Sequence, residues 1–366
     1  MNLLRSVDDV KEYNKFLGID IIRVVSMFCV IFLHCASNRL RVEMGNSGWD
    51  IVNYLTAFAT CGVPMFFMIS GALILKSKNT YSIKYTLKER VLRLLIPMII
   101  WSVIAASVRL YTDDSVALTA GNLYGEMINF FSKPVAVHLW FMYYLIPMYL
   151  ISPALKSFTD NAEGKVVRYI IILWLIQILS FTLTGILKED SQKALANINL
   201  INNIGFISGY LGYFILGWYI FNTDIKISNL WLIVIAIGAV MFIGAGTKAV
   251  TEYNGFYTET FKSYRSIFVV VLSSAVFILL NRIKYLPGFL HCVTAELAAV
   301  SYGVYLSHNV IIDLLNRWGL KNHSLIVVCM TFFIASVSSV VLMMVIRRIK
   351  FVSTVFAGVK LVKKEN

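Results

Sequence analysis

Arg23 and His34 are two ionisable residues inside the first long hydrophobic stretch of the chain. Residues 19–36 are otherwise mostly Ile, Val, Phe, Leu, Met and Cys, and an arginine at membrane depth costs about 2.5–3.5 kcal/mol even on a lenient insertion scale. In a helix the spacing brings both side chains onto one face, about 16 Å apart along the axis. Asp20 lies three residues before Arg23 and can pair with it there. The pattern indicates a functional helix face with a basic group near one membrane surface and an imidazole deeper in.

Arg90 and Arg93 open the third hydrophobic stretch. Residues three apart are neighbours on a helix, so two guanidinium groups could bind one phosphate bidentately. The alternative is that both are ordinary topology arginines whose side chains reach the membrane interface.

Polar side chains recur in two later stretches. His138 and Trp140 lie at the outer end of the fourth stretch, where Trp is an ordinary interfacial residue and the histidine is either solvated or lines an outer vestibule. Ser301, Tyr305 and His308 follow helical spacing and form one polar stripe. A single membrane histidine is usually a packing residue, but a stripe of hydroxyl, phenol and imidazole groups favours a cavity wall.

The second stretch contains the run Gly-Val-Pro-Met-Phe-Phe-Met-Ile-Ser-Gly at residues 62–71. Pro64 removes a backbone donor, which a membrane helix tolerates only where other groups satisfy the freed carbonyl. Ser70 and Gly71 permit close helix approach, so a kinked packing helix is the simplest interpretation of this run.

The composition predicts an all-α polytopic membrane protein. Soluble domains carry about 25% charged residues, whereas this chain of 366 residues has 14% charged and 58% hydrophobic residues. Repeated long apolar runs predict about ten transmembrane helices in a single membrane domain over residues 1–366. The predicted spans are 16–36, 52–75, 90–111, 137–156, 166–186, 204–222, 228–246, 264–281, 296–315 and 324–346.

Basic residues set the expected orientation. They crowd the loop after the second span, the loop after the fourth span and the end of the chain, at Lys76, Lys78, Lys84, Lys88, Arg90, Arg93, Lys156, Lys165, Arg168, Arg347, Arg348, Lys350, Lys360, Lys363 and Lys364. The positive-inside rule then places both termini in the cytoplasm, with residues 1–15 as an N-terminal segment without a cleavable signal and residues 347–366 as a basic tail. The net charge of +13 is therefore attributed to topology and anionic-lipid contacts, and nucleic acid is not an expected partner.

Metal and thiol chemistry are not indicated. The five cysteines include no CxxC pair and are typical of small hydrophobic residues. Cys35 adjoins His34 but points about 100° away from it on a helix, which disfavours an acyl-cysteine relay. The sequence has no HExxH motif, no P-loop and no cluster with metal-ligand spacing, so no metal site is predicted.

Taken in order along the chain, these motifs resemble the acyltransferase-3 family of integral membrane O-acyltransferases. The resemblance rests on the Arg and His of the first helix, the Pro-containing run at 62–71, Arg90 with Arg93, and the motif Ser-Tyr-x-x-Tyr-Leu-x-His at 301–308, and it covers essentially the whole chain. Trp49-Asp50-Ile51 and Lys133-Pro134 before His138-Leu139-Trp140-Phe141 are similar to the branch that O-acetylates enterobacterial common antigen.

The resemblance implies a reaction across a bacterial inner membrane. Acyl-coenzyme A, most simply acetyl-coenzyme A, is the expected cytoplasmic co-substrate, no bound cofactor is expected, and the acceptor is a hydroxyl of a cell-surface or lipid-linked glycan. By analogy, His34 is the general base, Arg23 lies near the acyl-thioester arm, and Arg90 and Arg93 bind donor phosphates. The residues expected to line the cavity are Asp20, Ser70, His138, Trp140, Ser301, Tyr305 and His308.

The residues leave two other functions open. The resemblance extends to the membrane half of serine racemases, for which a transport role has been suspected, and to proteins assigned to polysaccharide succinylation or export. The alternative function is therefore transport of a small polar solute such as serine, or of a glycan. A structural or sensory role in the membrane is the third possible function, and it leaves Arg23 and His34 unexplained. Some relatives carry a soluble acceptor-handling domain that is not seen here, so the acceptor is expected at the outer loops 112–136 and 247–263. The sequence leaves the acceptor, the acyl group and the oligomeric state open.

Overall fold

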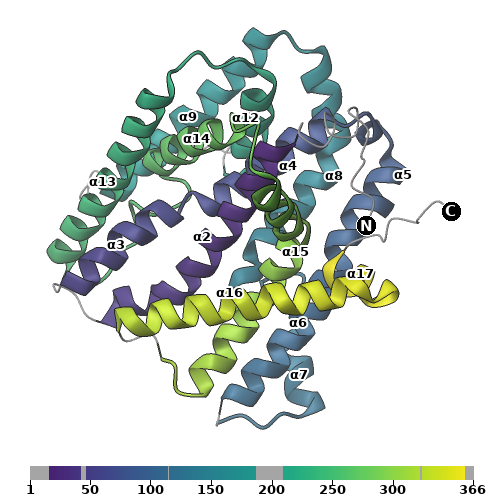
Figure 1. The fold of residues 1–366 in the computed structure, drawn as a ribbon, viewed down its shortest axis with the longest axis vertical. Coiled ribbons are helices and arrows are strands. Elements are labelled where there is room, and N and C mark those ends of the chain that lie inside the picture. The colour runs from purple at the N-terminus through teal and green to yellow at the C-terminus, as the bar shows by residue number, and fades with distance from the viewer. Residues whose placement is uncertain (1–15, 43–46, 114, 187–208, 322–323, 359–366) are drawn as a thin grey trace. The chain divides into compact units, whose positions relative to one another are not determined.

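A computed structural model describes residues 16–42, 47–113, 115–186, 209–321 and 324–358. Every regular element among these residues is a helix, in agreement with the predicted all-α class (Figure 1). The α-helices are α2 (Leu17–Val42), α3 (Ser47–Ala59), α4 (Gly62–Lys76), α5 (Ile83–Tyr85), α6 (Leu92–Thr112), α7 (Ala120–Met127), α8 (Trp140–Asn161), α9 (Gly164–Ile186), α12 (Leu211–Asn222), α13 (Asn229–Asn254), α14 (Ile267–Asn281), α15 (Gly288–Arg317), α16 (Leu325–Arg348) and α17 (Lys350–Ala357). Two 3₁₀ segments, η1 (Lys78–Tyr81) and η3 (Val137–Leu139), and a π-helical segment, η2 (Thr86–Val91), complete the set.

Seven helical stretches of the described residues are long and apolar enough to cross a membrane: Leu17–Val42, Gly48–Lys76, Ile83–Thr112, Gly164–Ile186, Asn229–Asn254, Gly288–Arg317 and Leu325–Arg348. Two further apolar helices, α12 and α14, are shorter. The predicted span 137–156 corresponds to α8, which is not among the seven, and the predicted span 204–222 begins outside the described residues. The count of ten spans is therefore not confirmed, and the cytoplasmic placement of both termini stays a prediction.

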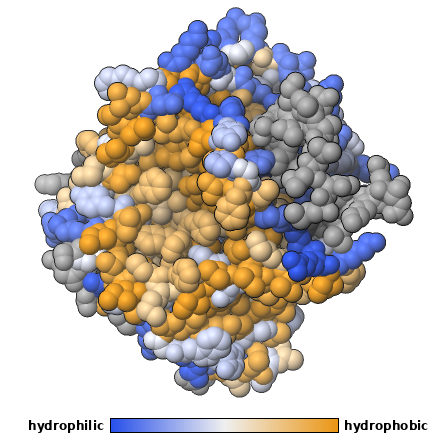
Figure 2. Space-filling view, viewed as in Figure 1, coloured by the Kyte–Doolittle hydropathy of each residue, from blue (hydrophilic) through white to orange (hydrophobic). Residues whose placement is uncertain are grey.

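Large apolar side chains cover outward surfaces of these helices (Figure 2). Leu230, Trp231 and Phe242 are exposed on α13, and Ile326 and Phe333 are exposed on α16. Exposed apolar surface of this extent is unfavourable in water and favourable against lipid. The surface therefore fits an integral membrane protein.

The described residues form two compact units, each drawn from three separate stretches of the chain. Unit 1 comprises Met1–Cys29, Asn53–Leu73 and Ala162–Ala299, and unit 2 comprises Val30–Val52, Ile74–Asn161 and Val300–Asn366. In unit 1, α13 packs on α14, and α9, α12 and α14 pack together. In unit 2, α6 contacts α7, α8 and α17, and α17 also packs on α16.

Glycines bring α4 and α12 into close contact within unit 1. A Cβ atom at Gly71 would collide with the backbone of Phe214, and one at Gly217 would collide with the backbone of Met68. This confirms the close helix approach predicted for Gly71, because only glycine leaves room for the facing backbone.

The predicted kink at Pro64 is a break between two helices. The turn at Thr60 and Cys61 separates α3 from α4, so Pro64 lies in the first turn of α4, where a missing N–H is tolerated. The hydroxyl of Thr60 donates to the carbonyl of Ala57 (2.7 Å) and helps to close the end of α3.

Candidate active site

Three histidine rings meet inside unit 2. His34 comes from α2, His138 from η3 and His308 from α15. The ring centroid of His34 lies 5.1 Å from that of His308 and 6.3 Å from that of His138, and the centroids of His138 and His308 are 5.2 Å apart. We call these residues the histidine cluster.

Tyr305 and its helix α15 hold His138 in the histidine cluster. The phenol of Tyr305 donates a hydrogen bond to the backbone carbonyl of His138, and Nε2 of His138 lies 3.2 Å from the carbonyl oxygen of Leu306. The ring of Phe141 packs edge-on against Tyr305, with centroids 5.7 Å apart. Since both hydrogen bonds join the same two segments, the position of His138 depends on α15.

The hydrogen bonds assign the tautomers of the two buried histidines. A carbonyl oxygen only accepts, so Nε2 of His138 carries the hydrogen that Leu306 accepts. By the same reasoning, Nδ1 of His308 carries a hydrogen, because it lies 2.7 Å from the carbonyl oxygen of Tyr305. The remaining nitrogens, Nδ1 of His138 and Nε2 of His308, are buried and have no hydrogen-bond partner among the described residues. In the neutral rings these two atoms carry lone pairs.

His34 differs from its two neighbours in exposure. His138 and His308 are 1% and 0% exposed, whereas His34 is only half-buried. A half-buried imidazole beside two unpartnered nitrogen lone pairs can take a proton from an incoming hydroxyl group. Within the described ranges, no group of three or more His, Cys, Asp or Glu side chains is arranged to hold a metal ion, and this includes the histidine cluster.

The loop that carries His138 is fixed at several of its carbonyl groups. The phenol of Tyr143 donates to the carbonyls of Phe130 and Lys133 (3.1 Å to Lys133). Nη1 of Arg109 donates to the carbonyl of Val135 (2.8 Å). We call residues 128–139 the His138 loop.

Arg109 was not predicted as a site residue. It also forms an ion pair with Glu126 of α7, so one side chain of α6 joins α7 to the His138 loop. Arg109 lies inside the predicted span 90–111, and an arginine in an apolar span is the same signal that marked Arg23. That signal could have identified it.

The predicted cavity residues of unit 2 have different surroundings. Tyr305 contacts the histidine cluster directly, with its ring centroid 6.1 Å from that of His138 and 6.0 Å from that of His308. The ring of Trp140 contacts Phe141 and Tyr144. Ser301 is buried two helical turns before His308. The structure therefore brings His34, His138, Tyr305 and His308 together.

Arg90 and Arg93 each have a different protein partner. Nη1 of Arg90 donates to the hydroxyl of Thr80 (2.7 Å), and Nη2 of Arg93 pairs with Oε2 of Glu89 (2.7 Å). The two arginines also lie on either side of the junction between the π-helical segment η2 and α6. Their phosphate-binding role stays a prediction that requires both side chains to change partners.

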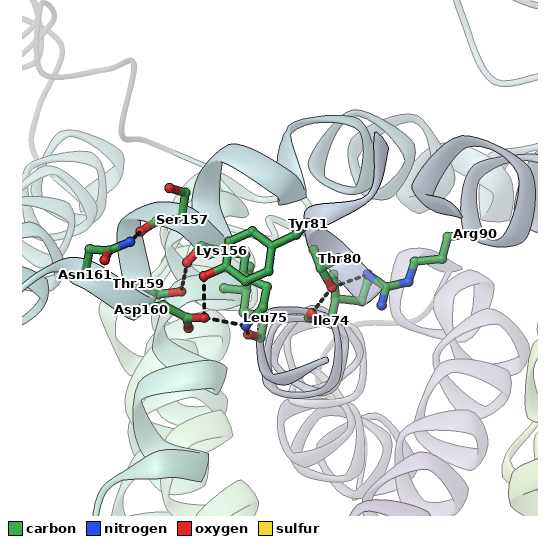
Figure 3. Close-up of polar contacts among 10 residues, drawn as sticks. All are labelled: Ile74, Leu75, Thr80, Tyr81, Arg90, Lys156, Ser157, Thr159, Asp160 and Asn161. Carbon is green, nitrogen blue, oxygen red and sulfur yellow. Dashed lines mark hydrogen bonds and ion pairs between the residues drawn. The ribbon is translucent and has the colours of Figure 1, made fainter. Parts of the chain in front are cut away.

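The neighbourhood of Arg90 is a dense polar network (Figure 3). The ammonium of Lys156 donates to the carbonyl of Leu75 (2.9 Å) and to Oδ2 of Asp160 (2.7 Å), which also accepts from Tyr81 (2.7 Å). The hydrogen bond to Asp160 raises the pKa of the Tyr81 phenol, because the phenol is held as a donor. The network closes the last turn of α4 and connects it to η1 and α8.

Three predicted site residues belong to unit 1. Nη1 of Arg23 pairs with Oδ1 of Asp20 (2.9 Å), as the spacing on one helix predicts. Ser70 lies in α4, next to the close contact of Gly71 with α12. Their roles in binding or catalysis stay predictions.

Comparison with known protein families gives the class of the protein. A family model described as an acyltransferase domain, acyltransferase-3, matches residues 16–348. Because the match covers most of the chain, the protein belongs to this family, which implies a membrane acyltransferase. No curated protein and no solved structure matched the chain.

Proposed function

We propose that the protein is an acyl-coenzyme A-dependent O-acetyltransferase of the bacterial cytoplasmic membrane, and that it acetylates a hydroxyl group of a cell-surface or lipid-linked glycan. The observation that carries this proposal is the histidine cluster, in which His34 is half-buried beside two buried imidazoles. The family match over residues 16–348 supports acyl transfer as the reaction class.

In the proposed reaction His34 is the general base. It takes the proton of the acceptor hydroxyl while the oxygen attacks the thioester carbonyl carbon, forming the new ester C–O bond. The C–S bond then breaks, and the proton on His34 passes to the leaving sulfur of coenzyme A. The reaction consumes no proton and needs no oxidant or metal ion.

His138 and His308 support this role through their lone pairs. When His34 gains a proton, both of its ring nitrogens become donors. The unpartnered Nδ1 of His138 and Nε2 of His308 belong to rings 6.3 and 5.1 Å from the His34 ring, and they can accept a hydrogen bond from the imidazolium. Such acceptors stabilise the protonated base in a site with little water.

The donor is proposed to approach from the cytoplasm. Its phosphates would replace Thr80, a neutral hydroxyl, as the partner of Arg90, and Glu89, the half-buried carboxylate four residues earlier, as the partner of Arg93. Bidentate arginine–phosphate contacts are among the strong hydrogen bonds of proteins. Arg23, now paired with Asp20, is proposed to contact the acyl-thioester arm.

The test compares His34→Gln and His34→Ala with the unmodified protein in purified form. We expect transfer of radiolabel from acetyl-coenzyme A to a lipid-linked glycan fraction to fall by about 10²-fold or more in both variants, since general-base catalysis contributes about 10²–10⁴-fold. Lys165→Ala serves as the control, because this exposed lysine at the start of α9 lies in unit 1, pairs with Glu163 and has no role in the proposed reaction.

Equal label transfer by His34→Gln and the unmodified protein would refute His34 as the base. Accumulation of an amino acid or sugar in proteoliposomes, with no label transfer by any form, would favour transport instead. For the donor site, Arg93→Ala should weaken binding of coenzyme A, whereas Arg168→Ala, which removes an exposed arginine at the start of α9, should not.

A further inference from the structure

The C-terminal helix α17 docks beside one of the proposed donor residues. It begins two residues after the region matched by the acyltransferase family model and packs on α6 and α16 (Figure 1). Its own Ser353 and Ala357 are buried, whereas Phe351 on its outer face is 79% exposed. One face of α17 is therefore committed to protein contacts.

Two contacts hold α17 against α6. Nε1 of Trp101 donates to the carbonyl of Phe356 (3.0 Å), and the two rings meet edge-on with centroids 6.3 Å apart. The Trp101 hydrogen bond occupies a carbonyl in the last turn of α17, a position that helices leave without an internal partner.

Pro97 leaves the carbonyl of Arg93 without its usual helical partner. In α6 the donor to this carbonyl would be the amide of residue 97, and proline has none. Gly358, the residue after α17, lies over this carbonyl: a Cβ atom at Gly358 would be 2.6 Å from the Arg93 oxygen and 3.3 Å from the ring of Tyr302. A side chain therefore cannot be accommodated without moving α17 or the Arg93 turn.

The same turn of α6 is also held from α15. The phenol of Tyr302 donates to the carbonyl of Leu94 (2.7 Å). Tyr302 precedes Tyr305 and His308 on this helix, so α15 contacts both the histidine cluster and the residues next to Arg93. Three elements, α6, α15 and the end of α17, thus meet at the backbone of residues 93 and 94.

We propose that α17 and Gly358 form a C-terminal clamp that fixes the Arg93 turn, and that this clamp sets the affinity of the protein for the polyanionic donor. The clamp rests on the proposed role of Arg93 in binding donor phosphates. Gly358 and Trp101 act as positioning residues, because Gly358 lies against the Arg93 carbonyl and Trp101 holds α17 on α6, and neither is proposed to touch the donor.

The test uses two matched glycines. Gly358 and Gly255 both follow a helix in the left-handed conformation, with φ of 63° and 74°, but nothing lies within 4 Å of a Cβ atom at Gly255. Asparagine tolerates this conformation, so Gly358→Asn and Gly255→Asn differ mainly in the contact with Arg93. Binding of coenzyme A is measured by titration calorimetry on the purified full-length protein, with the thermal unfolding midpoint recorded for each variant.

We expect Gly358→Asn to raise the Kd for coenzyme A about tenfold, a loss of about 1.4 kcal/mol, while Gly255→Asn leaves it unchanged. In steady-state assays the KM for acetyl-coenzyme A should rise with it, and kcat at saturating donor should stay the same. Trp101→Phe keeps an aromatic ring but removes the hydrogen-bond donor to Phe356, and should raise the Kd about threefold. This variant tests the clamp if Gly358→Asn does not fold.

Equal Kd values for Gly358→Asn and Gly255→Asn, with weaker binding by Arg93→Ala, would overturn the clamp and leave the proposed function intact. Unchanged binding by Arg93→Ala would instead overturn the proposed donor site, and the clamp with it. Phe351→Ala tests a lipid contact of α17: if this variant weakens binding as much as Gly358→Asn does, α17 acts through the membrane surface and the clamp is wrong.

Discussion

Lys262 should make the stability of the protein increase with pH above neutrality. It lies between α13 and α14 in unit 1 and is only 7% exposed. Its ammonium donates to Oδ1 of Asn53 (2.6 Å) and to the hydroxyl of Thr56 (2.8 Å), and Asn53 donates in turn to the carbonyl of Gly244 (2.8 Å). Burial lowers the pKa of Lys262 from its ordinary value of 10.5 to about 7, and the charge of Glu259 opposes this shift only in part.

The sign follows from the protons that each state binds. Above pH 7 the folded protein loses the Lys262 proton, whereas the unfolded chain keeps it up to its ordinary pKa of 10.5. Unfolding therefore takes up a proton in this window, and stability rises with pH. Each pH unit with a full proton difference is worth about 1.4 kcal/mol. From pH 7, where the folded lysine is half-protonated, to pH 9 the gain is about 2 kcal/mol.

Lys262→Met removes the titrating group and should remove this gain. We would measure the unfolding midpoint of both proteins between pH 7 and 9 in lipid nanodiscs, and expect the rise of the unmodified protein to exceed that of Lys262→Met by the equivalent of about 2 kcal/mol. Lys284→Met, which removes a lysine whose ammonium contacts only a nearby carbonyl in the described structure, is the control. Identical pH slopes for Lys262→Met and the unmodified protein would refute the reasoning.

Two further predictions concern ion pairs. Lys156→Met should lower the free energy of unfolding by about 2 kcal/mol, because the buried ammonium makes charged hydrogen bonds. Lys165→Met, which removes one partner of an exposed ion pair with the same 2.7 Å separation, should change the free energy of unfolding by less than about 0.5 kcal/mol. Equal effects of the two substitutions in thermal unfolding would contradict this prediction. Arg109→Gln should reduce kcat about tenfold by releasing the loop that carries His138; an unchanged kcat, or a loss confined to the KM of the donor, would show that the loop needs no such support.

The fold class and the local pairs could be predicted because they depend on short-range spacing. Hydrophobic runs predict membrane helices, since the bilayer requires about 20 apolar residues per span. The pairing of Asp20 with Arg23 follows from three residues on one helix. The closeness of Gly71 to a neighbouring helix follows from the absence of a side chain. None of these inferences depends on which helices are neighbours in the folded protein.

Helix boundaries were harder to predict. Pro64 was expected to kink one long helix, but the chain breaks at residues 60 and 61 and places the proline in the first turn of α4, where no amide donor is needed. The π-helical segment that ends just before α6 likewise changes the register between Arg90 and Arg93, and no residue pattern indicates it. Such local choices depend on how neighbouring helices pack.

The sequence alone therefore determined that the chain is an all-helical membrane protein with ionisable residues inside long apolar helices, because hydrophobicity and helical periodicity are local properties. Tertiary structure decided which of those residues meet. His34, His138 and His308 come from distant stretches of the chain, and their association depends on hydrogen bonds such as that from Tyr305 to the carbonyl of His138. The position of Gly358 against the Arg93 carbonyl could not be predicted from the sequence either. Pro97 leaves this carbonyl without its usual partner, but Pro97 and Gly358 are far apart in the sequence and no periodic pattern relates them.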